Sequence, residues 1–221
     1  MVTAREQTAG RGRQGRAWTA PDGKALLYSA IVRPLDERHL LLPLSVPLAV
    51  CAAAEALRSD SECMVKWPND VWLEGRKLAG ILIEAKPQDG WAVIGVGLNL
   101  SIAPEEFPAD LRQPAISLFD ATAESRGESR RSLPAVAPAG LPPTPSTAAA
   151  VLNRHLDHWV WAGQDDVLGE WRRRDGLLGR EVSWEDGSGV ADGIDDRGNL
   201  VVALAGGGSV SLGAGEVQLR L

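Results

Sequence analysis

Residues 10–18 read GRGRQGRAW and form the most distinctive pattern in the chain. Glycines at positions 10, 12 and 15 allow the backbone to approach a ligand closely and to turn its N–H groups toward it. Arginines at positions 11, 13 and 16 add fixed positive charge to the same loop. The stretch therefore predicts a loop that holds an anionic ligand, and the rest of the chain has to show which kind.

Three known glycine-rich loops compete for this stretch. The dinucleotide fingerprint has the same glycine spacing, but it must open a helix, and residues 18–23 (WTAPDG) carry turn residues where that helix would run. A kinase-type loop lacks its companion motifs downstream. An arginine-glycine arm that contacts RNA stays open on these residues alone, because Trp18 could stack on a free base or on the adenine of a nucleotide.

Composition favours a small anionic ligand over nucleic acid. The chain has 221 residues, of which 44% are hydrophobic and 24% charged, which is enough for one medium globular domain with a small appendage. A net charge of −6 argues against binding DNA or RNA, which needs a basic field. Cys51 and Cys63 lie in apolar surroundings without metal-ligand spacing, so we expect buried thiols in a reducing, cytoplasmic setting.

The longest apolar run, residues 40–57, has roughly the length of a membrane span. Pro43, Pro47 and Glu55 interrupt it, so we interpret it as a buried helix and expect no membrane contact. Asp36 can cap this helix, although the prolines could move its start toward Ser45.

Short β-favouring runs joined by tight turns dominate the first hundred residues. Consecutive hairpins predict an antiparallel or mixed sheet, not a doubly wound parallel one. Helices are expected later in the chain, at residues 147–161 and 165–173. Strands are expected at residues 25–33, 63–67, 71–73, 77–85 and 91–98.

The C-terminal part of the chain changes character twice. Residues 121–146 are dominated by Ala, Pro, Ser, Gly and Arg, which predicts a flexible insertion. Residues 179–221 alternate short β runs, the last at 217–219, with glycine-containing turns, which predicts a small β-barrel. Its core is so slight that it should dock on the main domain. We therefore divide the chain into domains at 1–174 and 175–221.

Three further segments carry polar residues that a simple core does not need. Residues 66–70 (KWPND) place a cation, an amide and a carboxylate at the end of a strand. Lys77 opens an apolar strand in which Gly80 allows a close approach. Residues 95–99 (GVGLN) leave room for a ligand and end on an amide. Each signal is weak alone, since a lysine at a strand end is most often simply solvated.

Together, the four segments resemble the biotin protein ligase family. Its members carry, in the same order, a glycine-arginine loop ending in Trp, a Lys-Trp-Pro-Asn-Asp turn, a Lys-x-x-Gly-Ile-Leu strand and a Gly-x-Gly-x-Asn strand end. The resemblance runs from about residue 4 to the C-terminus. It implies an α+β fold: a mixed β-sheet catalytic domain akin to class II aminoacyl-tRNA synthetases, then an SH3-like β-barrel.

The resemblance also implies a reaction in two steps. ATP and biotin give biotinyl-AMP and pyrophosphate, and a lysine of a biotin carboxyl carrier protein then takes the biotinyl group. Joining a carboxylate to an α-phosphate brings two anions together, so cations must offset their repulsion. The resemblance assigns catalysis to Arg11, Arg13 and Lys77, biotin binding to these three with Gln7, Gly10 and Gly80, nucleotide binding to Arg16, Trp18, Lys66, Asn69 and Asn99, and Mg²⁺ to Asp70.

The chain departs from the family pattern in two respects. It lacks the N-terminal helix-turn-helix of the repressor members, so we expect a monofunctional ligase that does not bind DNA. It also begins after a Ser-Thr segment that contacts the biotin ring in the family, so we expect a truncated start and weak biotin binding. A lipoate or octanoate ligase, which has a similar fold, is the alternative activity, and a homodimer stays open.

Overall fold

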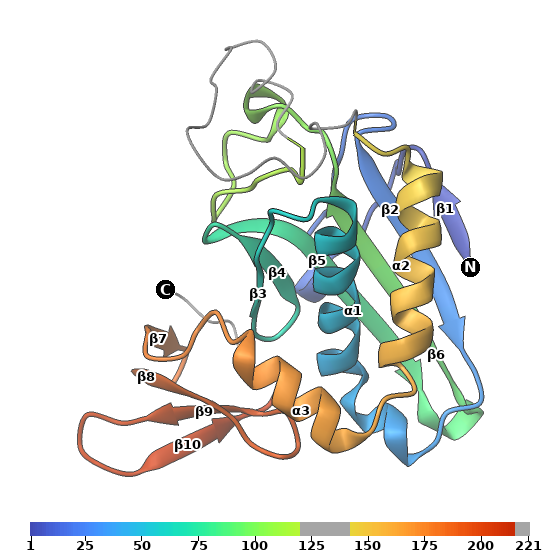
Figure 1. Cartoon of the computed structure of the whole chain (residues 1–221). Helices are drawn as coiled ribbons and strands as arrows, with labels where there is room; N and C mark the ends of the chain where they lie inside the picture. The colour runs from blue at the N-terminus through green and yellow to red at the C-terminus, as the bar shows by residue number, and fades with distance from the viewer. Residues whose placement is uncertain (120–141, 215–221) are drawn as a thin grey trace.

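The computed structural model describes residues 1–119 and 142–214, and shows an α+β chain with two sheets (Figure 1). Neighbouring strands of the larger sheet are antiparallel throughout. Parallel pairing within the described residues is confined to two single bridges, Val65 with Asp175 and Lys77 with Ala115. In spatial order, the six strands are β1 (Val2–Ala4), β2 (Ala25–Val32), β6 (Trp91–Asn99), β5 (Arg76–Lys86), β4 (Asp70–Leu73) and β3 (Cys63–Lys66).

The two faces of this sheet have different neighbours, as the central strand β6 shows. Its residues 92, 94, 96 and 98 are buried in the main core, whereas residues 93, 95, 97 and 99 line a cavity. Side chains alternate between the faces of a strand, so one sequence of nine residues serves both. The helices α1 and α2 cover the core face (Figure 1), which leaves the opposite face for a ligand.

The helices confirm the expected positions with small shifts. Asp36 caps the chain here as predicted, accepting a hydrogen bond from Arg38 N at 3.0 Å. The alternative start near Ser45 is wrong, because Pro43 stands in the first turn, where its missing N–H is not needed. The helical segments are η2 (Glu37–Leu41), α1 (Leu42–Leu57), α2 (Pro145–Trp159) and α3 (Gln164–Arg173).

The expected flexible insertion at residues 121–146 falls mostly outside the described residues. Its last two positions belong to α2, which begins at Pro145, so the expected end is wrong by two residues. Thr144 caps α2 by accepting a hydrogen bond from Thr147 N at 3.2 Å. Proline fits the first turn after such a cap, which explains why a proline-rich stretch runs directly into a helix.

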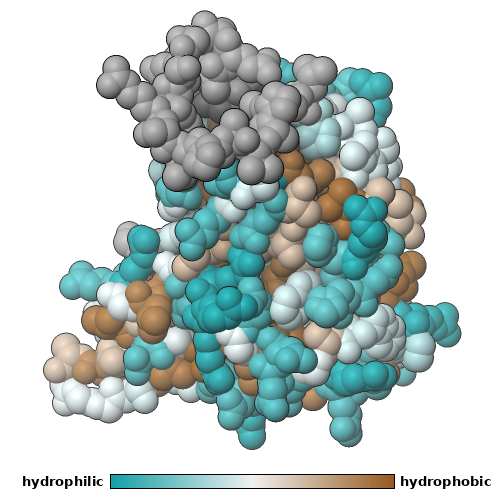
Figure 2. Space-filling view, viewed as in Figure 1, coloured by the Kyte–Doolittle hydropathy of each residue, from teal (hydrophilic) through white to brown (hydrophobic). Residues whose placement is uncertain are grey.

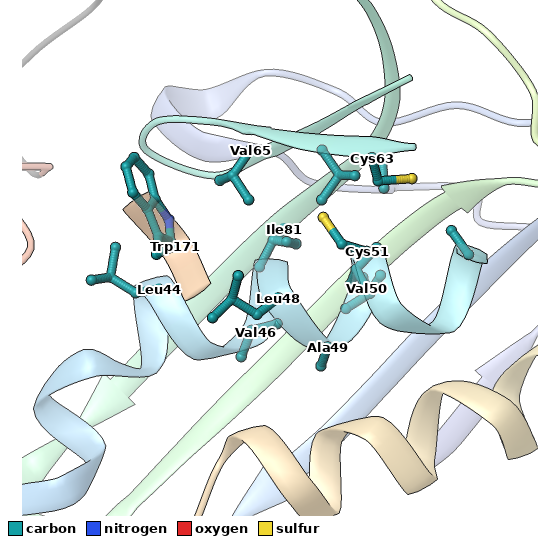
Figure 3. Close-up of a cluster of buried hydrophobic side chains, with 14 of the residues drawn as sticks. Leu44, Val46, Leu48, Ala49, Val50, Cys51, Cys63, Val65, Ile81 and Trp171 are labelled. Carbon is teal, nitrogen blue, oxygen red and sulfur yellow. The ribbon is translucent and has the colours of Figure 1, made fainter. Parts of the chain in front are cut away.

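α1 is the central helix of the core (Figure 3). Leu48 and Cys51 of this helix lie against Cys63, Val65 and Ile81 of the sheet, and all five are buried. The two cysteines are free thiols, as predicted, and burial raises the pKa of Cys51 well above its ordinary value. Thiols of this kind pack as small hydrophobic groups.

The segment Glu37–Leu57 is long and apolar enough to cross a membrane by length and composition. However, 67% of its most apolar stretch is buried inside the protein. Side chains from the sheet and from α2 and α3 enclose it. The segment is therefore the core helix that the sequence predicted.

The second sheet is antiparallel, with spatial order β10-β9-β8-β7. Its inward residues, including Val182, Ala191 and Leu200, belong to the same core cluster as α1, so the sheet docks on the larger unit as expected. Figure 2 shows hydrophobic colour over this sheet at lower left. Val190 of β8 and Leu204 after β9 are exposed hydrophobic residues. The strand expected at 217–219 lies outside the described residues. The strands are β7 (Glu181–Trp184), β8 (Gly187–Ile194), β9 (Leu200–Ala203) and β10 (Ser209–Leu212).

Hydrogen bonds join the segments that flank this sheet to the larger one. Gly176 N donates to Val65 O at 2.8 Å, directly after α3. Trp67 is 1% exposed, and its Nε1 donates to Gly198 O at 3.1 Å in the loop before β9. The tryptophan of the KWPND turn therefore serves the contact between the two sheets, not the cavity.

Asp175 gives this junction a pH dependence. Its side chain is buried, its Oδ1 accepts from Leu177 N at 2.8 Å, and its Oδ2 has no partner among the described residues. Burial raises the pKa of this carboxyl above its ordinary value of 3.8. The folded state therefore binds the proton more tightly than the unfolded state, and stability is lost as pH rises through the raised pKa.

We expect Asp175→Asn to remove this loss. The variant should gain stability relative to the parent as pH rises from about 4 to about 7.5. Urea unfolding at both pH values measures the change, and Asp186→Asn on an exposed turn provides the matched control. An equal effect of Asp175→Asn at both pH values would contradict the assignment.

Candidate active site

The glycine-arginine loop forms a narrow hairpin over the open face of the sheet. Trp18 N donates to Gly10 O at 3.0 Å and Gly12 N to Arg16 O at 2.6 Å, while the tip is the 3-10 turn η1 (Arg13–Gly15). A Cβ at Gly10 would lie 2.2 Å from Trp18 O. Gly10 therefore serves the close pairing of the hairpin's two arms, which is why the spacing resembles a dinucleotide fingerprint without being one.

A glycine pair provides the floor of the site. Gly80 of β5 and Gly97 of β6 are directly opposite each other, and the Trp18 ring lies on both. A Cβ at Gly97 would lie 2.3 Å from Cε2 of that ring, and a Cβ at Gly80 would lie 2.9 Å from its Cζ3. Any side chain at either position would displace the indole. The packing of the Trp18 ring therefore explains why both positions are glycine.

Charged groups meet beside this floor. Lys77 Nζ lies 2.7 Å from Asp70 Oδ1 and 5.6 Å from the centre of the Trp18 ring. Gln113 Nε2 donates to the other carboxylate oxygen, Asp70 Oδ2, at 2.7 Å. Lys66 Nζ in turn donates to Gln113 Oε1 at 2.8 Å. The cluster holds two ammonium groups, one carboxylate and one bridging amide.

Arg13 and Lys66 have lowered pKa values in this crowded site. Burial, and then the charge of Arg16, lower the pKa of Arg13, whose Nη2 donates to Ala214 O. Burial likewise lowers the pKa of Lys66, against the opposing effect of Asp70. Cations held together in partial burial are poorly compensated within the protein, so the site favours an anionic ligand.

The cavity has a volume of about 780 Å³ and is bordered by the loop and the sheet. Two predicted site residues do not line it. Gly10 lies behind the Trp18 backbone, and Lys66 lies behind Gln113, with its ammonium 5.3 Å from the centre of the Trp72 ring. The predicted residues that line the cavity are Gln7, Arg11, Arg13, Arg16, Trp18, Asn69, Asp70, Lys77, Gly80 and Asn99.

The two predicted nucleotide-binding amides have structural partners. Asn69 Nδ2 donates to Ile81 O at 2.8 Å, and Asn99 Nδ2 donates to Ile116 O at 3.1 Å. Each amide thereby fixes a neighbouring segment beside the cavity. That Asn69 and Asn99 bind a nucleotide stays a prediction. Their side-chain oxygens are the atoms that would make this contact, because their Nδ2 atoms already donate to the backbone.

Sequence reasoning missed Gln113. The stretch after residue 101 has no long periodicity, but residues 113–119 extend along the sheet: Ile116 N donates to Lys77 O at 3.0 Å and Leu118 N to Asn99 O at 3.0 Å. The alternation of apolar Ile116 and Leu118 around polar Ser117 was the available signal. It spans only positions 116–118, which is too short to separate from a loop.

The assignment of Mg²⁺ to Asp70 has little support from the protein's own donors. In residues 1–119 and 142–214, no three His, Cys, Asp or Glu side chains gather into a possible metal site. Both Asp70 oxygens are already engaged, by Lys77 and Gln113. A protein-built magnesium site does not fit these residues, and no chemical step is derived through the metal.

Comparison with known proteins agrees with the geometry. Residues 1–100 match the model of the biotin/lipoate A/B protein ligase family, and residues 177–220 match that of the biotin protein ligase C-terminal domain. The computed fold is similar to a biotin protein ligase from Aquifex aeolicus in complex with biotin and ATP, with a TM-score of 0.74 and 25% identity over 99% of this chain and 87% of that one.

Two curated relatives extend the similarity over the whole chain. A biotin--[acetyl-CoA-carboxylase] ligase from Mycobacterium tuberculosis is 35% identical over 98% of this chain and 77% of its own length. A ligase of the same name from Paracoccus denitrificans is 32% identical over 91% of this chain and 82% of its own length. A glycine floor under a loop tryptophan, a lysine beside it and similarity along the full length lead to one assignment: the chain belongs to the biotin protein ligase family.

Proposed function

We propose that this protein activates biotin with ATP and transfers it to a lysine of a biotin carboxyl carrier protein. One observation carries the proposal: the Lys77 ammonium lies beside the glycine floor, in a cavity bordered by Arg11, Arg13 and Arg16. The similarity to the Mycobacterium tuberculosis ligase and to the Aquifex aeolicus enzyme supports biotin and ATP as the substrates.

In the first step, a biotin carboxylate oxygen bonds to the α-phosphorus of ATP, and the bond to pyrophosphate breaks. Both reacting groups are anionic, so Lys77 and the loop arginines lower the barrier by offsetting charge that is brought together. Glycines at 80 and 97 allow the Trp18 ring to lie directly on the sheet beside Lys77. The loop above the mixed anhydride limits the access of water that would hydrolyse it.

In the second step, the neutral amine of a carrier lysine attacks the biotinyl carbonyl carbon. An amide bond forms, AMP leaves, and the amine gives up a proton.

We expect ATP to enter as its magnesium complex, with the metal held mainly by the phosphates, since Mg²⁺ commonly keeps its waters and binds substrate phosphates with one or two carboxylates.

Biotin-dependent exchange of pyrophosphate into ATP tests the first step, and biotin transfer to a purified carrier domain tests the second. Lipoate and octanoate in place of biotin test the alternative activity. Exchange that proceeds with lipoate and not with biotin would overturn the proposal.

The remaining proposals concern the setting of the enzyme. The net charge of −6 supports the absence of DNA binding, and the buried free thiols Cys51 and Cys63 fit a reducing cytoplasmic location. The enclosed position of α1 supports the absence of membrane contact. Sedimentation with and without biotin and ATP distinguishes a monomer from a homodimer.

Trp18→Ala tests the expected stacking of Trp18 on adenine. Losing a stacking aromatic costs about 1–3 kcal/mol in nucleotide sites, so the variant should raise the KM for ATP severalfold or more. The KM for biotin should rise less. Steady-state exchange kinetics with each substrate varied in turn measure both constants, and a larger rise for biotin would count against stacking.

A further inference from the structure

Gln113 is held by the same residue whose side chain serves the site. Lys77 N donates to Pro114 O at 2.8 Å, and Lys77 O accepts from Ile116 N at 3.0 Å. These two bonds flank Ala115 and form the parallel bridge to Lys77. The backbone next to Gln113 therefore has a fixed position relative to β5, although it lies outside the named strands.

The side chain of Gln113 joins two groups of opposite charge. Lys66 Nζ donates to its Oε1 at 2.8 Å, and its Nε2 donates to Asp70 Oδ2 at 2.7 Å. The other oxygen of that carboxylate, Oδ1, lies 2.7 Å from Lys77 Nζ. An amide offers an acceptor and donors side by side, so it satisfies an ammonium and a carboxylate together without adding charge.

This arrangement determines which of the two lysines forms an ion pair with the Asp70 carboxylate. Asp70 is buried and is the single anion between the two ammonium groups of the cluster. With Gln113 present, Lys66 is occupied by the amide oxygen, and Oδ1 of Asp70 is left for Lys77. Without the amide, Lys66 and Lys77 would compete for the same carboxylate, and Asp70 would be free to rotate.

We propose that Gln113 is a positioning residue for the ligase reaction, which orients Asp70 and thereby holds the Lys77 ammonium beside the glycine floor. The catalytic effect of Gln113 rests on the proposed function. The contact chain from Lys66 through Gln113 and Asp70 to Lys77 exists independently of any substrate, so it can be tested with and without turnover.

The first test exchanges the amide and the carboxylate. Gln113→Glu keeps an acceptor for Lys66 but removes the donor to Asp70, and should lower kcat for biotin-dependent pyrophosphate exchange about tenfold, as expected for one lost bond to a charged group. The KM values should change much less. Asp70→Asn should cause a similar loss.

In the double variant, the new amide at position 70 can donate to the new carboxylate at position 113, which accepts from Lys66, and the net charge is that of the parent. We expect it to recover kcat to within about threefold of the parent, because the bond pattern is restored. Gln88→Glu, the same change on an exposed turn, is the control. A double variant no better than the poorer single variant overturns the proposal, as does a Gln113→Glu effect confined to KM.

The second test needs no activity. Acetic anhydride labelling of the intact protein, followed by mass spectrometry, reports the exposure and free-amine fraction of each lysine. Gln113→Leu should accelerate labelling of Lys77 about threefold relative to Lys86, because the Lys77 ammonium would no longer be held against Asp70. Gln88→Leu should not. Unchanged labelling of Lys77 overturns the positioning role, whereas a parent protein without biotin-dependent exchange overturns the proposed function and leaves this readout intact.

Discussion

Lys77→Ala is expected to lower biotin-dependent pyrophosphate exchange by about a hundredfold or more, the loss of one preorganised cation from a charge-neutralising site. The reason lies in its position: the Lys77 ammonium lies between Asp70 and the Trp18 ring and borders the cavity. The loss should appear in kcat, because the two anions are closest in the transition state.

Two comparisons separate this effect from general damage. Arg76→Ala removes a neighbouring cation that is exposed and paired with Glu74, so its exchange rate should stay near that of the parent. Supplying synthetic biotinyl-AMP bypasses the first step, so transfer to the carrier should suffer far less in Lys77→Ala. Near-normal exchange in the folded variant would remove Lys77 from the proposed role.

Gly97→Ala is expected to lower exchange by about tenfold or more, since its new Cβ would stand 2.3 Å from the Trp18 ring and displace the loop that covers the site. The fold should survive, because the indole belongs to a partly exposed hairpin and not to the main core. Circular dichroism and thermal unfolding check the fold, and exchange kinetics check the site.

A double-variant cycle shows whether the ring is the cause. In a Trp18→Ala background the Cβ at position 97 meets no indole, so the added loss from Gly97→Ala should fall to about twofold or less. Equal losses in both backgrounds would mean that the methyl group acts on the ligand or on the sheet instead.

Local chemistry explains why much of the fold could be predicted. The strands expected at residues 25–33 and 91–98 differ from β2 and β6 by one residue, because apolar runs and turn glycines mark their ends. Asp36 likewise marks the start of a helical segment through a contact only two residues long. Signals of this kind act within a few positions and are visible in the sequence.

The site required information that no local pattern contains. Lys66 was expected to bind nucleotide together with Asn69, but its ammonium donates to Gln113, 47 positions away in the sequence. Gly97 was expected to leave room for a ligand, yet in the structure the Trp18 ring fills that room. Pairing across the sheet, not spacing along the chain, decides both outcomes.

The KWPND turn connects the smaller sheet to the cavity. Its Trp67 donates a hydrogen bond to Gly198 O in the loop before β9, and its last residue, Asp70, pairs with Lys77 in the cavity. Because the two contacts lie within one short turn, a change in the position of this turn affects both the docking of the smaller sheet and the binding of a ligand in the cavity. Any coupling through it is reciprocal: a ligand that tightens the junction binds more tightly, by the same free energy, when the junction is formed.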